Sequence, residues 1–207
     1  MVELSQTTLK GMNKAYPKLE STRTLLRLAQ ADDVPAIIDY YTLNQVHLAP
    51  FEPIRDEDFF TERYWGVEVK ARWGAFTADQ SLKLFLFHKE DSKVIIGSIN
   101  FANFVRGVFQ SCTLGYSVAA AFEGKGYMTE ALKEAISYVF AELNLHRIIA
   151  AYLPHNQRSG RLLKRLGFLV EGYARDYLMI NGQWQDHILT SLINHNWQSD
   201  EFSQRTN

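Results

Sequence analysis

Residues 122–131 constrain this chain more than any other stretch. They read FEGKGYMTEA, with a glycine on each side of one lysine, and a helical pattern begins directly after them. The preceding residues 114–118 have the composition of a strand. Glycines permit unusual backbone conformations and close approach of a ligand, and the first N–H groups of a helix have no partner within it. The pattern therefore predicts a phosphate or pyrophosphate site at residues 124–129, or else a tight turn that binds nothing.

Composition narrows the class of protein without choosing a function. With 207 residues, of which 46% are hydrophobic and 22% charged, the chain has room for one or at most two globular domains. A net charge of −1 argues against a broad nucleic-acid surface. Cys112 is the single cysteine, so we expect a small buried side chain and no disulfide. No apolar run reaches the roughly 18 residues of a membrane span and no signal pattern is present, so we expect a cytoplasmic protein.

Hydrophobic periodicity predicts a mixture of strands and helices. Short turns between three central strands imply antiparallel pairing, whereas the helix after the glycine turn implies a parallel crossover. Asn181-Gly182 predicts a hairpin, and Asn156 predicts a helix cap. Residues 47–53 contain two prolines and predict a loop that lines a substrate cleft or packs on the surface. The expected strands are 24–28, 82–88, 94–101, 111–118, 146–153, 168–173, 177–180 and 184–193, and the expected helices are about 34–43, 56–76, 127–143 and 157–166.

The ends of the chain differ in composition from its middle. Residues 1–21 are mostly polar and show no sustained period, so we expect an irregular N-terminal arm. Residues 198–207 form a polar tail. A single domain is expected between them, at residues 22–197, without internal repeats or linkers.

Several short motifs, taken in order, resemble the GCN5-related N-acetyltransferase (GNAT) family. They are GKGYMTEA at 124–131, NQRS at 156–159, LGF at 166–168 and EG at 171–172. The runs 154–160 and 171–187 further resemble the Rim group, whose members acetylate ribosomal proteins on an N-terminal amine. The resemblance covers about residues 22–197. It implies an α+β fold with a twisted, mixed, mostly antiparallel sheet, helices on both faces and a parallel splay in the centre.

The same resemblance implies acetyl-CoA as co-substrate. Its pyrophosphate would lie on the amides of the glycine turn, its pantetheine arm along the end of the preceding strand, and its sulfur near Ser159. The implied cofactor-binding residues are Ser117, Val118, Gly124, Lys125, Gly126, Tyr127, Met128, Thr129, Asn156 and Ser159. The chain departs from the family at Ala121, where a Gln or Arg is usual. Because backbone amides hold the phosphates, this departure weakens the cofactor site at most moderately.

Direct attack of an amine on a thioester needs proton transfer but no covalent enzyme intermediate. Asp176 matches the position of the carboxylate assigned as base in related Rim enzymes, although a solvated carboxylate at a strand end is an equal alternative. Ser159 is expected to protonate or hold the departing thiolate, and Glu123 is a second candidate for the base. His155 and His187 are interpreted as loop-shaping and packed residues. No histidine pair has metal-ligand spacing with a carboxylate, so no metal is expected.

The resemblance predicts acetylation of the N-terminal alanine of a small-subunit ribosomal protein, by direct attack in a ternary complex. The ribosome or its precursor is then a partner, with no membrane and no sequence-specific nucleic acid. The alternatives are an acetyltransferase for a small amine (a polyamine, an amino acid or an antibiotic) and a non-catalytic acyl-CoA-binding protein in ribosome assembly. A basic helix face is interpreted as solvated, as a contact for the adenosine phosphate of CoA, or as a steering surface; it comprises Arg158, Arg161, Lys164 and Arg165.

Overall fold

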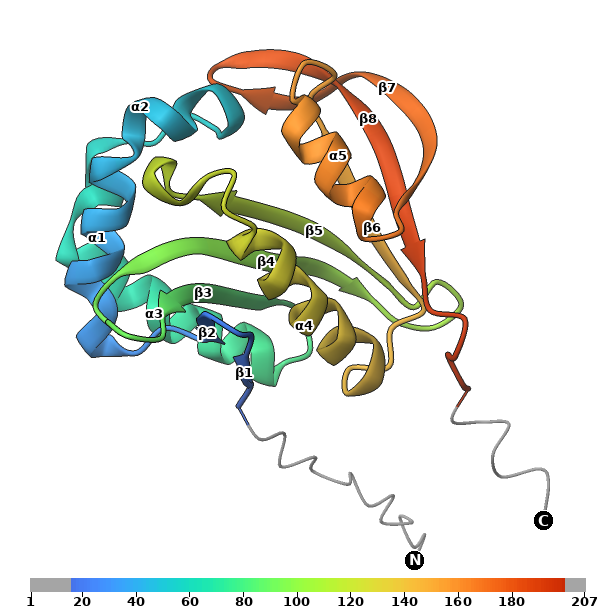
Figure 1. The fold of residues 1–207 in the computed structure, drawn as a ribbon, viewed down its shortest axis with the longest axis horizontal. Helices are drawn as coiled ribbons and strands as arrows, with labels where there is room; N and C mark the ends of the chain where they lie inside the picture. Colours follow the sequence, from blue (N-terminus) through green and yellow to red (C-terminus); the bar gives the residue numbers. More distant parts are fainter. Residues whose placement is uncertain (1–15, 200–207) are drawn as a thin grey trace, which may run out of the picture.

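The computed structural model describes residues 16–199, and an eight-stranded sheet runs through them (Figure 1). The strands are β1 (Lys18–Glu20), β2 (Thr24–Arg27), β3 (Leu82–His88), β4 (Ile95–Val105), β5 (Ser111–Val118), β6 (Arg147–Tyr152), β7 (Leu169–Ile180) and β8 (Gln183–Ile193). The helices are α1 (Val34–Leu43), α2 (Gln45–Leu48), α3 (Glu62–Thr77), α4 (Tyr127–Ala141) and α5 (Gln157–Arg165). Short 3-10 turns are η1 (Ala31–Asp33), η2 (Ala49–Phe51), η3 (Glu57–Phe60) and η4 (Ala120–Phe122).

The sheet is mixed and mostly antiparallel, as the sequence predicted. Its strand order is β1-β2-β3-β4-β5-β6-β8-β7. Among the strands of residues 16–199, only β5 and β6 pair in parallel, and the other neighbouring strands are antiparallel. Helix α4 makes the crossover between the two parallel strands, which confirms the central crossover expected from the pattern.

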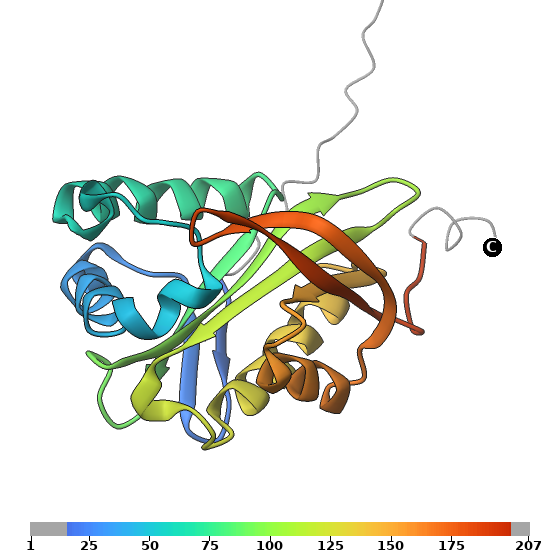
Figure 2. The same ribbon diagram turned by 90° about the horizontal axis from the view of Figure 1, so that it is seen from above.

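Helices cover both faces of the sheet, and the inner strand β3 shows why. Leu84 belongs to a buried cluster with Leu132 of α4, whereas its neighbour Phe85 belongs to a second cluster with Trp65 of α3. Successive side chains of a strand point to opposite faces, so β3 needs cover on each. Figure 2 shows α1 and α3 on one side of the sheet and α4 and α5 on the other.

The two parallel strands separate at the centre of the sheet. Their pairing runs from Ser111 opposite Arg147 to Leu114 opposite Ala150. Beyond Leu114, β5 continues while still paired to β4, and β6 continues while paired to β8. Within the described residues, the last part of β5 therefore turns an unpaired edge towards β6. This is the parallel splay that the resemblance implied.

The N-terminal half departs from expectation in three places. The expected irregular arm contributes strand β1, which pairs with β2, although residues 1–15 lie outside the described part. The expected loop at 47–53 contains the helical turns α2 and η2. The expected helix at 56–76 is two pieces, because Asp56 accepts the N–H of Phe59 and Thr61 accepts that of Tyr64. Two successive side-chain caps separate η3 from α3.

The C-terminal hairpin has one long outer strand where two were expected. β7 runs through both expected strands, and its register with β8 shifts between Ala174 and Leu178. Asp176 lies inside this shift with a φ of 46°. The turn itself is as predicted, since Asn181 and Gly182 have φ values of 47° and 75°. This register shift takes the place of the expected break, and β7 has a second one between Val170 and Gly172. Residues 200–207 of the tail lie outside the described part.

Three further findings concern the buried thiol, metal ligands and membrane spans. Cys112 is buried as predicted, and burial raises the pKa of its thiol to about 12. Among residues 16–199, no group of His, Cys, Asp and Glu side chains is arranged to hold a metal ion. No helix in this part of the chain combines the length and hydropathy needed to span a membrane.

Candidate functional site

The glycine turn leaves the start of α4 open. After β5 ends, η4 leads into residues 123–126, and α4 begins at Tyr127. Gly124 and Gly126 have φ values of 71° and 84°, which favour glycine. Gly126 is the N-cap residue, and no side chain caps the helix. The first N–H groups of α4 therefore remain available to an anion.

A remote arginine fastens this turn to the sheet. Arg23, just before β2, donates from Nη2 to the carbonyl oxygen of Lys125 at 2.9 Å. Its Nε donates to Oε1 of Glu130 at 2.9 Å, and its guanidinium lies 4.0 Å from the ring centroid of Tyr127. The sequence analysis missed Arg23, because its partners lie far along the chain and no local pattern marks it.

The turn opens into a cavity of about 460 Å³, which we call the loop cavity. Its walls combine the glycine turn, the end of β5, the start of α5 and the segment around η2. Predicted site residues that line it are Ser117, Val118, Gly124, Gly126, Tyr127, Met128, Thr129, Asn156 and Ser159. Lys125 does not line it, although its carbonyl group is held by Arg23. The structure thus brings together nearly the whole predicted cofactor set.

Charged side chains surround the loop cavity. Three of the four residues of the predicted basic face line it: Arg158, Arg161 and Arg165. Arg158 pairs with Glu123, and Nε2 of His47 lies 3.6 Å from Oε1 of the same carboxylate. Glu123, the second candidate for the base, is therefore held between two positively charged or chargeable side chains.

A second cavity of about 500 Å³, which we call the strand cavity, lies along β4, β5, β6 and the C-terminal hairpin. The two cavities share part of their walls, and we call the shared residues the junction. The junction residues are Phe51, Glu52, Tyr116, Ser117, Asn156 and Ser159. A ligand in the loop cavity and a ligand in the strand cavity would meet here.

A hydroxyl pair stands at the junction. The hydroxyl of Tyr116 lies 2.6 Å from Oγ of Ser159. Burial raises the pKa of Tyr116 to about 12, so its hydroxyl keeps its proton at neutral pH. Oδ1 of Asn156 accepts the backbone N–H of Ser159 at 3.1 Å, which confirms the predicted cap of α5. Tyr116 was missed, because a tyrosine within a strand pattern carries no catalytic signal.

The remaining predicted residues lie elsewhere. Asp176 is exposed and lines neither cavity, and its backbone N–H donates to Oδ1 of Asp186 at 2.9 Å. Its role as base stays a prediction. His187 is buried and lines the strand cavity, with Nδ1 2.9 Å from the carbonyl oxygen of Gln185. His155 lines neither cavity, and its ring centroid lies 6.4 Å from that of Phe51.

Comparisons with known proteins point in the same direction as the cavities. Residues 23–169 match the family model described as an acetyltransferase (GNAT) domain. The [ribosomal protein uS5]-alanine N-acetyltransferase of Escherichia coli is 45% identical over 192 residues, which cover 90% of this chain and 97% of that protein. The Vibrio fischeri ribosomal-protein-S5-alanine acetyltransferase has a TM-score of 0.84 and 37% identity, over 88% of this chain and 100% of that chain. Mycobacterium smegmatis RimJ, in complex with CoA-disulfide, has a TM-score of 0.80 and 26% identity over 91% of each chain.

Proposed function

The chain belongs to the acetyltransferase (GNAT) family, which uses acyl-CoA donors, and from that premise we propose that it acetylates the N-terminal alanine of ribosomal protein uS5. One observation carries the choice of acceptor: the 45% identity to the Escherichia coli enzyme extends over 97% of that enzyme. The correspondence therefore includes the walls of both cavities rather than the cofactor motif alone. With this acceptor, the proposed reaction takes place in the cytoplasm, and the ribosome or its precursor is a proposed partner.

The loop cavity is the proposed site of acetyl-CoA. The open start of α4 offers backbone N–H groups to the pyrophosphate, and Gly124 leaves space beside it, since no atom lies within 4 Å of where a Cβ would stand. Arg161 and Arg165 of the cavity wall offer positive charge to the adenosine phosphate. Ser117 and Val118, on the edge of the splay, would hold the pantetheine arm together with Asn156, since all three line the loop cavity. When bound, acetyl-CoA supplies an acetyl group activated as a thioester.

The strand cavity is the proposed site of the protein N-terminus. Its amine reaches the thioester at the junction, where Ser159 and Tyr116 stand as a hydroxyl pair. Both hydroxyls hold their protons at neutral pH, so the pair is suited to protonate the departing sulfur. Cys112 is buried in the sheet with a raised thiol pKa, which is consistent with direct attack by the amine and no acyl-enzyme.

Asn156 is expected to serve both the helix and the cofactor. Asn156→Ala removes the cap on the Ser159 N–H and should lower the free energy of unfolding by about 1 kcal/mol. Asn156→Asp keeps an acceptor in the same place but loses the amide N–H donor, so stability should hold while the KM for acetyl-CoA rises by roughly tenfold. Denaturant unfolding and steady-state kinetics check the two effects. A change confined to the KM of the amine acceptor would contradict the assignment.

A thiol-release assay with acetyl-CoA tests the proposed function. The acceptors are a peptide that begins with the N-terminal residues of uS5, the same peptide with its amine blocked, and a panel of small amines. Turnover on the free peptide alone supports the proposal. Turnover on a small amine alone would assign the chain to small-molecule acetylation, and bound CoA without turnover on any acceptor would favour a non-catalytic role.

A further inference from the structure

The proposed reaction requires a group that removes protons from the acceptor nitrogen. An N-terminal amine has a pKa near 8, so at neutral pH most of it is a positively charged ammonium. The group that binds this ammonium must lie where the strand cavity meets the loop cavity. Of the junction residues, Glu52 is the one with a carboxylate. The remaining junction residues are neutral, so this position stands out on charge alone.

The backbone of Glu52 is fixed across the cleft. Glu52 follows η2, and its carbonyl oxygen accepts the N–H of Asn181, in the hairpin turn, at 2.9 Å. Two residues on, the side chain of Ile54 packs so closely on the turn that a Cβ at Gly182 would lie 2.9 Å from it. Figures 1 and 2 both show the η2 segment beside the tip of the β7–β8 hairpin. The carboxylate is thus presented from an anchored segment.

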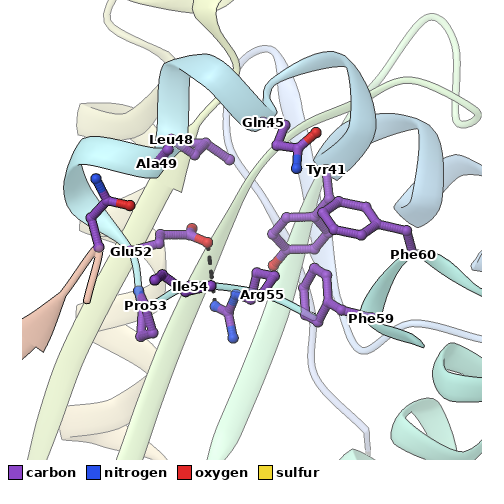
Figure 3. A pocket seen from close by; sticks show the side chains of 11 residues that line it. Tyr41, Gln45, Leu48, Ala49, Glu52, Pro53, Ile54, Arg55, Phe59 and Phe60 are labelled. Carbon is purple, nitrogen blue, oxygen red and sulfur yellow. Dashed lines mark hydrogen bonds and ion pairs between the residues drawn. The ribbon is translucent and has the colours of Figure 1, made fainter. Parts of the chain in front are cut away.

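The carboxylate itself lies at a meeting point of cavities. Besides the loop and strand cavities, Glu52 lines a smaller one of about 140 Å³ between α1, η2 and η3. In Figure 3 its side chain extends from its segment into that cavity, with a dashed line to Arg55. Only 18% of the side chain is exposed, and Oε2 lies 3.3 Å from Nη2 of Arg55. A mostly buried carboxylate that lines open space can form a charge-assisted hydrogen bond with a cationic ligand.

Two tyrosines of α1 lie in the same region. Tyr41 lines two of the cavities that Glu52 lines. Burial first, with the charge of Glu52 as a smaller cause, raises the pKa of Tyr40 and of Tyr41. Both hydroxyls therefore keep their protons, and Arg55 is the positive side chain in contact with the carboxylate. Ser117 connects the same region to the cofactor side, because its Oγ lies 2.9 Å from the hydroxyl of Tyr40.

We propose that Glu52 is a catalytic residue that binds the α-ammonium of the acceptor and accepts its protons. This inference rests on the proposed function, and it names the side chain that recognises the amine. The predicted base, Asp176, lies on the exposed strand β7 outside both cavities, whereas Glu52 lies at the junction of the two. The sequence suggested residues 47–53 as a candidate wall of a substrate cleft but did not single out Glu52, because the position of this side chain depends on the contact between η2 and the distant hairpin.

The proton transfers balance as follows. Glu52 accepts one proton from the ammonium and passes it to solvent. The neutral nitrogen then bonds to the thioester carbonyl carbon while the C–S bond breaks and its electron pair goes to sulfur. The nitrogen gives its surplus proton to Glu52, and the Tyr116–Ser159 pair protonates the sulfur. Both groups recover through solvent, so ammonium and thioester become amide, thiol and one released proton.

Glu52→Gln tests this assignment, with Glu57→Gln as a matched control. Glu57 is an exposed carboxylate that lines none of the three cavities. At pH 7, we expect Glu52→Gln to lower kcat/KM for the alanine peptide by about 20-fold or more, with CoA affinity unchanged by calorimetry. The deficit should shrink between pH 6.5 and pH 9, because the free amine then forms without help. Glu57→Gln should stay within about twofold of the unchanged chain.

Other outcomes overturn the assignment. Normal turnover by Glu52→Gln would rule out Glu52 as the catalytic residue. A loss of kcat/KM of the same size at every pH would also rule it out, because it would indicate a structural role. Loss of turnover in Asp176→Asn alone would assign the base to Asp176. Binding of the free and blocked peptides to the CoA-loaded protein provides an independent measurement. If the unchanged chain acetylates no peptide, the proposed function fails. The role of Glu52 is still supported if the unchanged chain binds the free peptide more tightly than the blocked one and Glu52→Gln abolishes this preference. Equal binding of both peptides by the unchanged chain overturns the role of Glu52.

Discussion

Gly124→Asp is expected to weaken CoA binding by about 100-fold. The substitution places a carboxylate in the open space beside the glycine turn, where the pyrophosphate is proposed to lie. Two unit charges about 5 Å apart repel by roughly 3 kcal/mol at the effective dielectric constant of a protein surface, and each 1.4 kcal/mol changes an affinity tenfold. Calorimetric titration with CoA measures the loss directly, without any acceptor.

Gly124→Asn is the matched control for this experiment. Position 124 has a φ of 71°, so either side chain carries the same backbone strain, which Asn and Asp tolerate better than other residues. Asn has nearly the same shape as Asp but no charge, so it should weaken CoA binding by only a few-fold. Equal losses for both variants would show that strain rather than phosphate repulsion is responsible. If Gly124→Asp binds CoA with unchanged affinity, the glycine turn is not part of the CoA site.

The sequence was sufficient for the cofactor side of the site because the signals there are local. Gly124 and Gly126 adopt the positive φ values that only glycine adopts easily, and a helix begins at the next residue. Asn156 caps α5 by accepting the N–H of Ser159, which lies three residues further along the chain. A four-residue motif therefore contains both partners of this hydrogen bond. Such features depend on neighbours along the chain, so their residue types and spacing are enough to predict them.

The acceptor side could not be predicted in the same way. Glu52 and Tyr116 reach the junction because η2 meets the hairpin and because β5 separates from β6, and both are tertiary events. Arg23 fastens the glycine turn from the start of β2 by contacts that only folding creates. Asp176 remains an untested prediction, since a motif position suggested a role for a side chain that lies exposed in the register shift of β7. Local pattern alone does not tell which cavity a side chain will line.

One departure of the fold has a local origin. Residues 56–76 are interpreted from the sequence as one helix with charges spread through it, yet Asp56 and Thr61 each cap a separate piece. Asp and Thr are better suited to caps than to helix interiors, so this break was a local signal that the prediction overlooked. That break also shapes the smaller cavity, because Phe59 and Phe60 of η3 line it opposite Glu52. A local error of a few residues therefore concealed one wall of this smaller cavity.

Tyr116→Phe is expected to lower kcat by about 100-fold at neutral pH, within the range that general acid catalysis commonly contributes. The ring and its packing remain, and only the hydroxyl that contacts Oγ of Ser159 is lost. Ser159→Ala should have a similar effect, because the sulfur then lacks the adjacent donor. Both variants should bind CoA within a few-fold of the unchanged chain. Steady-state kinetics at saturating acetyl-CoA and alanine peptide measures kcat.

A double variant and a pH profile decide whether the two hydroxyls act as one proton donor. If they do, the double variant Tyr116→Phe with Ser159→Ala should lower kcat little more than either single change does. The first substitution already disables the shared proton donor, so the second has little further effect. Burial raises the pKa of Tyr116 to about 12, so the donor should keep its proton, and kcat should show no alkaline loss, between pH 7 and pH 10. Independent, multiplying losses would assign the two hydroxyls separate roles. A normal kcat in Tyr116→Phe would leave Ser159 as the proton donor without help from Tyr116.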